Sequence, residues 1–130
     1  MRTFSYAAAA AATLFACAGP TPRQLADQRA LAEARPLGPP EDCVTLTSIR
    51  DTRVRDDRTI DFRLTGGRVL RNRLPNSCPG LGFEDSFGYR TSLNRLCSVD
   101  VITVRRTGSG TTGATCGLGS FQPIELPDRL

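Results

Sequence analysis

Histidine, lysine and tryptophan are missing from this 130-residue chain, and methionine occurs once, at the first position. Without histidine the chain cannot build a Ser-His or Cys-His nucleophile system, and it lacks a common nitrogen ligand of zinc. With two tyrosines, six phenylalanines and no tryptophan, it has few side chains on which nucleic-acid bases could stack. We therefore expect no enzyme activity, no metal or other cofactor and no nucleic-acid partner.

Since lysine is absent, every basic residue is an arginine, and 17 arginines against 13 acidic residues give a formal charge of +4. Removal of residues 1–16 would take away Arg2 and leave 16 arginines against 13 acids, or +3. A mild positive charge is compatible with anionic partners such as lipid headgroups or glycan phosphates. Scattered arginines usually form a solvated surface, so the charge balance alone identifies no partner.

The chain also lacks an apolar run long enough to span a bilayer as a helix, which takes about 20 residues. Its apolar stretch, residues 4–16, follows the single charge of Arg2 and is typical of a secretory signal peptide. We therefore divide the chain into a signal peptide over 1–16, an anchor and tether over 17–41, and one folded domain over 42–127.

Residues 14–17 read Leu-Phe-Ala-Cys and resemble the lipobox of bacterial lipoproteins, although Phe15 replaces the small residue usual at its position. This resemblance implies that Cys17 becomes the first residue and carries a diacylglyceryl group. Ala18 stands where lipoproteins of the inner membrane carry Asp, so the expected location is the outer membrane, facing the periplasm. The alternative is ordinary cleavage after Ala18, which would release a soluble periplasmic protein without Cys17.

Four further cysteines, Cys43, Cys78, Cys97 and Cys116, form an even set in a short exported chain, which is typical of a disulfide framework. A zinc site would need C-x-x-C pairs or histidines, and the chain has neither. A domain of this size buries little apolar surface and often needs such covalent links. The cysteines therefore predict two disulfides rather than a metal site.

Beyond residue 43, short β-type runs alternate with turn residues, which predicts an all-β fold: a small antiparallel sheet or barrel of about six strands. The expected strands are 44–49, 59–65, 68–74, 83–91, 96–106 and 114–124, with further strand character at 52–55. Residues 23–35 are rich in helix formers but have few apolar anchors. We expect a short helix there, within a tether that holds the domain off the membrane.

The two adjacent glycines at 66 and 67 predict a hairpin. A three-residue loop, residues 66–68, pairs apolar side chains with one another and sets Asp61 opposite Arg73. A two-residue loop would pair core residues with arginines. Because a one-residue slip moves every side chain to the other face, the apolar pattern favours the three-residue loop.

The strand registers also bear on the disulfide pairing, because bridged Cα atoms lie within about 7 Å. In the last expected hairpin, Cys97 and Cys116 lie too far apart to pair. We favour Cys43–Cys97 with Cys78–Cys116. Cys43–Cys116 with Cys78–Cys97 stays open as the alternative and requires the loop 79–82 to fold back.

Acidic residues offer no clear catalytic pair. Asp56 and Asp57 are adjacent, as are Glu84 and Asp85, but neighbours along a strand point to opposite faces. The first pair predicts a turn. Asp100 alternates with apolar residues in an expected strand, so we expect it to be buried and paired with an arginine.

Two features hint at ligand binding. Residues 108–113 read G-S-G-T-T-G, but a dinucleotide site needs a helix after this motif, and here a strand is expected. Arg63 and Arg71 are expected to face outward on neighbouring strands near Arg73, an arrangement that is unfavourable unless something anionic lies between them. These three arginines are a weak candidate site for an anionic ligand. The alternative is solvation and pairing with Asp61.

Four segments of the chain resemble a family of small four-cysteine envelope proteins of Gram-negative bacteria, known only as a domain of unknown function. The segments are DCVTLTSIRDTRVRDDRTIDFRL, RNRLPNSCPGLGFEDSFGYRTS, LCSVDVITV and TCGLGSFQPIE, between residues 42 and 125. The resemblance implies export and a disulfide-linked β domain but assigns no activity. We expect a non-enzymatic envelope lipoprotein with a structural or protein-interaction role. The alternative is a binding module for an anionic glycan or lipid of the envelope.

Overall fold

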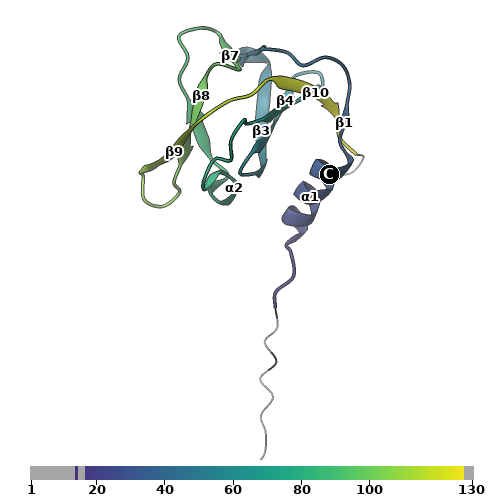
Figure 1. Cartoon of the computed structure of the whole chain (residues 1–130), viewed down its shortest axis with the longest axis vertical. Coiled ribbons are helices and arrows are strands. Elements are labelled where there is room, and N and C mark those ends of the chain that lie inside the picture. The colour runs from purple at the N-terminus through teal and green to yellow at the C-terminus, as the bar shows by residue number, and fades with distance from the viewer. Residues whose placement is uncertain (1–13, 15–16, 128–130) are drawn as a thin grey trace, which may run out of the picture.

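The computed structural model describes Leu14 and residues 17–127. The expected signal peptide therefore lies outside the described residues, apart from Leu14. The elements, in chain order, are α1 (Pro22–Glu33), β1 (Arg35–Pro36), β2 (Cys43–Thr45), the 3-10 helix η1 (Leu46–Ser48), β3 (Ile49–Asp56), β4 (Thr59–Leu64), β5 (Val69–Arg73), α2 (Leu81–Glu84), β6 (Phe87–Tyr89), β7 (Arg95–Cys97), β8 (Val101–Arg105), β9 (Thr112–Gly117) and β10 (Phe121–Glu125) (Figure 1).

The strands of the described chain form three antiparallel sheets. A five-stranded sheet has the order β1-β10-β5-β4-β3, a two-stranded sheet pairs β2 with β7, and a three-stranded sheet has the order β6-β8-β9. The predicted all-β class with two disulfides is confirmed. The described strands number ten rather than six because two expected strands are each divided in two, the strand character at 52–55 belongs to a full strand, β3, and β1 precedes the expected domain.

Local backbone features divide one expected strand and shorten another. The expected strand 96–106 becomes β7 and β8 because the chain turns between them, and the carboxylate of Asp100 accepts the backbone N–H of Cys97 at 2.7 Å. The prediction that Asp100 is buried against an arginine is therefore wrong. The expected strand 83–91 begins instead as α2, which ends at Asp85 with φ 51°, a left-handed conformation that aspartate tolerates better than most residues.

The division of the expected strand 114–124 into β9 and β10 depends on a contact distant in sequence. Gly119 packs so closely on the carbonyl oxygen of Arg73 that a Cβ atom would not fit. The buried side chain of Asn72 accepts the N–H of Gly119 at 2.8 Å and donates to its carbonyl at 2.7 Å. These bonds hold the chain against β5 where it passes from β9 to β10.

The hairpin of β4 and β5 has a three-residue loop, but one position earlier than predicted. The loop is 65–67 rather than 66–68, because the N–H of Leu64 donates to the carbonyl of Arg68 and these two residues close the loop. Asp61 consequently lies opposite Arg71 and not opposite Arg73. The observed and predicted registers differ by two residues, and a slip of two keeps every side chain on its face, so the apolar pattern could not separate them.

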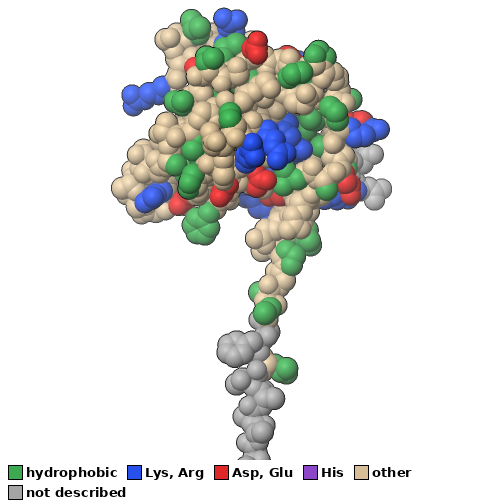
Figure 2. Space-filling model, viewed as in Figure 1, with side chains coloured by type: hydrophobic (Ala, Val, Ile, Leu, Met, Phe, Trp, Pro, Cys, Tyr) green, Lys and Arg blue, Asp and Glu red, His purple; other side chains and the backbone are tan. Residues whose placement is uncertain are grey.

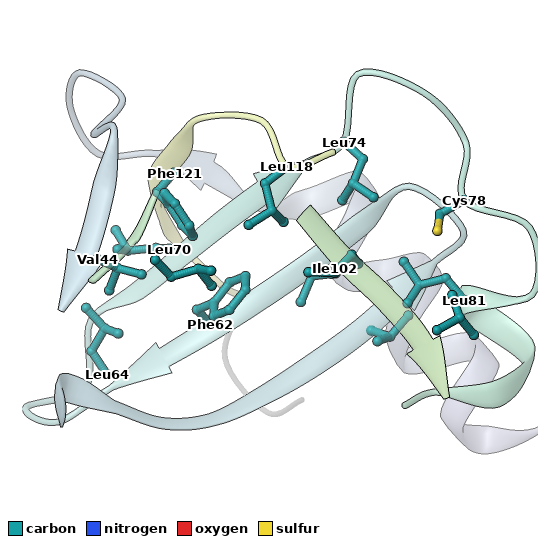
Figure 3. Close-up of a cluster of buried hydrophobic side chains, with 14 residues drawn as sticks. Val44, Phe62, Leu64, Leu70, Leu74, Cys78, Leu81, Ile102, Leu118 and Phe121 are labelled. Carbon is teal, nitrogen blue, oxygen red and sulfur yellow. The ribbon is translucent and has the colours of Figure 1, made fainter. Parts of the chain in front are cut away.

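One apolar core lies between the sheets (Figure 3). Its centre is Phe62 of β4, whose ring meets Phe121 of β10 and Phe87 of β6 edge-on, with centroids 5.4 Å and 6.3 Å away. Buried residues from all three sheets surround this centre, among them Val44, Leu70, Leu96 and Ile102. Burial of each large side chain contributes about 1.5–3 kcal/mol, so the core is what holds the short strands together.

The two disulfides have the favoured pairing. Cys43–Cys97 links directly opposed residues of β2 and β7, and Cys78–Cys116 links the loop before α2 to β9, with Cα atoms 5.9 Å apart. The alternative pairing and the zinc alternative are therefore wrong. The fifth cysteine, Cys17, is exposed and free.

The helix predicted within 23–35 is confirmed, but it is docked on the domain. Thr21 caps it: its hydroxyl accepts the N–H of Gln24, and the Gln24 side chain accepts the N–H of Thr21. Ala30 and Asp27 are buried against the outer face of the five-stranded sheet, and the following β1 pairs with β10. The folded unit therefore begins at Thr21, well before the expected boundary at residue 42.

Candidate functional site

A chain of alternating charges, here called the charge network, lies between α1 and the outer face of the five-stranded sheet. Asp61 is fully buried and accepts from Arg71 at 2.7 and 2.9 Å and from Arg55 at 2.8 Å. Asp27 of α1 accepts from Arg55 at 2.8 Å and from Arg53 at 3.0 Å. Each carboxylate therefore joins two guanidinium groups, and the network fixes the helix to the sheet.

The charge network leaves no open group for chemistry. Hydrogen bonds between ionised partners are roughly twice as strong as neutral ones, and both carboxylates accept them from two directions. Among the described residues, no buried side-chain nitrogen or oxygen lacks a partner. The network therefore positions α1 and does not offer a carboxylate to a substrate.

The predicted arginine site does not form a single surface. Arg71 is largely covered by α1, where it binds Asp61 and donates to the carbonyl of Ala30 at 3.2 Å, so the prediction that it faces outward is wrong. Arg63 is exposed and pairs with Asp51 at 2.7 Å, which raises the pKa of Arg63. Arg73 is exposed and forms no ion pair with the described residues.

The adjacent acids have separate structural roles. Asp56 and Asp57 lie at the predicted turn, where their carboxylates accept backbone N–H groups of the turn and of α2. Glu84 accepts the backbone N–H and the hydroxyl of Thr107 at 2.8 and 2.9 Å, which lowers the pKa of Glu84. Asp85 pairs with an arginine of α1. Asp56, Asp57 and Asp85, but not Glu84, line an open groove of about 850 Å³ between the two helices, with walls of mixed charge.

A concentration of positive charge without nearby acids lies elsewhere, in the three-stranded sheet, its loops and β7. Residues 86–120 hold four arginines and one acid, whereas the other described residues hold eleven arginines and eleven acids. All ten ion pairs between described residues exclude these four arginines. They are Arg90, Arg95, Arg105 and Arg106, all exposed. In Figure 2, an arginine side chain protrudes without an acidic neighbour at the upper left, on the side where Figure 1 shows β8.

A shallow concavity of about 350 Å³ lies on this sheet. Its lining residues are Gly88, Tyr89, Arg90, Val101, Thr103, Arg105 and Thr112. Gly88 of β6 lies opposite Thr103 of β8 and forms part of the floor. A Cβ at Gly88 would lie 2.7 Å from Nη2 and 2.8 Å from Nε of Arg105, so the guanidinium lies directly over the glycine backbone.

The concavity has the chemistry of an anion site. Two guanidinium groups, Arg90 and Arg105, line it without a carboxylate partner among the described residues. The hydroxyl of Thr103 adds a polar group to the floor, 3.2 Å from the hydroxyl of Thr115. Guanidinium groups match phosphate and carboxylate in a bidentate geometry, so the concavity can hold such a group.

Sequence reasoning missed this site because its arginines come together only through the pairing of β6 with β8. The signal that could have revealed it is the near absence of acids between residues 86 and 120. The motif at 108–113 gives no further site, since it joins β8 to β9 and no helix follows it.

No protein-family model, curated protein or solved structure matches the chain. The resemblance to small four-cysteine envelope proteins therefore stays a prediction. Within residues 17–127, no helix is long and apolar enough to cross a membrane. The same part of the chain contains no group of three or more His, Cys, Asp or Glu placed to hold a metal ion.

Proposed function

We propose that this chain is a non-enzymatic lipoprotein of the cell envelope, anchored through Cys17, whose β domain binds an anionic envelope glycan. The signal peptide pattern and the lipobox resemblance support the anchor, and Cys17 is exposed outside the folded unit. The alanine at position 18 favours the outer membrane, with the domain in the periplasm. Two or more acyl chains on Cys17 would anchor the protein stably, which a single chain does not.

The two disulfides support export, because such bonds persist in oxidising compartments such as the periplasm. Intact mass, measured on protein from its native membrane, separates the two routes of processing. A chain that starts at Cys17 with added acyl mass supports the lipoprotein. A chain that starts at Gly19 without lipid would instead be a soluble periplasmic protein.

The observation that carries the binding proposal is the pair of guanidinium groups in the concavity. Arg90 and Arg105 have no carboxylate partner among the described residues, while most arginines of the five-stranded sheet do. The concavity is open, has a volume of about 350 Å³ and is lined by Tyr89 and Val101 beside the two arginines, so it has room for one phosphorylated or carboxylated sugar. An anionic glycan is therefore the favoured ligand.

The test compares two double variants with the same change of net charge. Arg90→Ser with Arg105→Ser removes the arginines of the concavity, and Arg50→Ser with Arg73→Ser removes two exposed arginines elsewhere that form no ion pair with described residues. Retention on an immobilised phosphorylated oligosaccharide should fall at least about tenfold for the first variant only, since each charge-assisted contact contributes about 1.5–3 kcal/mol. Equal losses would indicate nonspecific charge attraction and contradict the proposal. Binding to phosphatidylglycerol vesicles but not to the glycan would move the ligand class to lipid.

The second candidate is a structural or protein-interaction role, favoured by the edge strand β9. This strand pairs only with β8 among the described strands, and residues 107–124 contain no charged side chain. Charged side chains are one feature that keeps edge strands from pairing with another chain, and β9 has none, although its register with β8 shifts between Thr112 and Thr115. Photocrosslinking from Thr115 in living cells tests this role, and the absence of any protein adduct would count against it.

A further inference from the structure

The segment between the anchor and the folded unit is very short. Only four peptide steps separate Cys17 from Thr21, whose capping box starts α1. A fully extended chain spans at most about 3.6 Å per residue, so this segment reaches about 14 Å. A domain of about 100 residues is on the order of 30 Å across. The segment is therefore too short to let the domain rotate freely above the membrane, and one end of the domain has to face the bilayer.

The start of α1 has a fixed place on the domain. Arg23, in its first turn, pairs with Asp85 at the end of α2, and Asp27 is held by the charge network. The chain consequently leaves the domain on the side of α2. Figure 1 shows α2 at the lower end of the domain, where the N-terminal segment departs, and β7 at the opposite end.

The α2 end carries an aromatic side chain with no place in the core. Leu81 is fully buried and fixes the short helix, while Phe83, two residues later, is 90% exposed. Phe83 and Arg23 line the same groove between the helices, so Phe83 lies near the point where the chain departs. Leu25, also in the first turns of α1, is half exposed. Removing a phenylalanine side chain from water is favourable, and a lipid surface beneath this end would allow it.

We infer that the α2 end of the domain rests on the membrane that holds the acyl chains of Cys17, and that Phe83 enters its interface. The occupant of this surface is the lipid bilayer. This inference rests on the proposed lipid anchor and adds an orientation to it. It also places the β7 end, with the exposed Val99, toward the periplasm.

The absence of tryptophan from the chain makes a direct test available, because any introduced tryptophan is the sole reporter. Phe83→Trp reports from the α2 end, and Val99→Trp, at an 87% exposed position beside β7, is the matched control. Each full-length variant is purified with its lipid and placed in phosphatidylethanolamine–phosphatidylglycerol vesicles with brominated acyl chains. Intact mass confirms the acyl group on Cys17 and both disulfides.

The expected result is a blue-shifted emission and at least about twofold stronger quenching for Phe83→Trp than for Val99→Trp, since the burial of about one aromatic ring favours insertion. Equal quenching of the two, or none in either, would overturn the orientation while leaving the anchor intact. A mass without an acyl group on Cys17 would overturn the proposed anchor and the orientation together. The mass measurement therefore distinguishes the two failures.

Discussion

The five-stranded and three-stranded sheets use arginine in opposite ways. On the five-stranded sheet, Arg55 and Arg71 are buried against Asp61 and hold α1 in place. On the three-stranded sheet, Arg90 and Arg105 are exposed and have no carboxylate partner among the described residues. Where an acid lies opposite an arginine on an adjacent strand, the two form an ion pair that stabilises the fold. Where acids are scarce, the same side chain remains available to an external anion.

The largest expected effect comes from breaking the charge network. Asp61→Asn keeps the shape of the side chain but leaves Arg55 and Arg71 without their counter-charge, and removal of one partner from a buried ion pair costs about 3–5 kcal/mol. Asp51→Asn, which breaks the exposed pair with Arg63, should cost less than about 1 kcal/mol. Denaturant unfolding measures both. Equal losses in the two variants would contradict the account of the network.

A somewhat smaller effect follows from removal of the disulfide Cys78–Cys116, which joins the loop before α2 to the three-stranded sheet. Replacing Cys78 and Cys116 by alanine opens a link across 38 positions of sequence, which should lower the free energy of unfolding by about 2–5 kcal/mol. Because Cys116 lies in β9, hydrogen exchange should rise in β9 well before it rises in β4. The opposite order would show that this disulfide does not hold the three-stranded sheet to the rest.

A modest change in the concavity should separate binding from stability. In Gly88→Ala, the new methyl group meets the flexible end of Arg105, which can move aside, so unfolding should change by less than about 1 kcal/mol. Glycan retention should nevertheless fall severalfold, because the guanidinium leaves its place. Gly117→Ala, also on this sheet, adds a methyl group in open space and serves as the control. Unchanged retention in Gly88→Ala would remove Arg105 from the proposed site.

The smallest effect concerns Glu84, which lies where α2 meets the loop after β8. The N–H of Thr107 and its hydroxyl lower the pKa of Glu84 below its ordinary value of 4.5. The resulting stabilisation is present above about pH 4.5 and is lost as the pH falls through the lowered pKa. An NMR titration should show this lowered pKa, and Thr107→Val should raise it part of the way back. A pKa at or above 4.5 in the unaltered protein would contradict the bond.

Much of the fold could be predicted from local patterns. The alternation of apolar and polar residues identified β4 and β5, and the strand registers favoured the observed pairing of Cys78 with Cys116. The exact register of the hairpin of β4 and β5 could not be predicted, because a two-residue slip leaves the apolar pattern unchanged. Asp61 was therefore placed opposite the wrong arginine.

The remaining errors arise from contacts distant in sequence. The helix α1 has few apolar residues, and its position depends on the bonds of Asp27 to two arginines of β3. Gly119 ends β9 because it packs on Arg73, which no local pattern reveals. The arginines of the concavity were missed for the same reason, since only strand pairing brings Arg90 and Arg105 to one surface.

The most direct test of the contrast between the five-stranded and three-stranded sheets is an NMR titration that follows the arginine Nε–H signals while a phosphorylated oligosaccharide is added. We predict that the signals of Arg90 and Arg105 shift with increasing ligand, and that those of Arg55 and Arg71, held by buried carboxylates, stay in place. Shifts at Arg55 and Arg71, or none at Arg90 and Arg105, would contradict the claim that the arginines of the charge network are held within the fold while those of the concavity are available to a ligand.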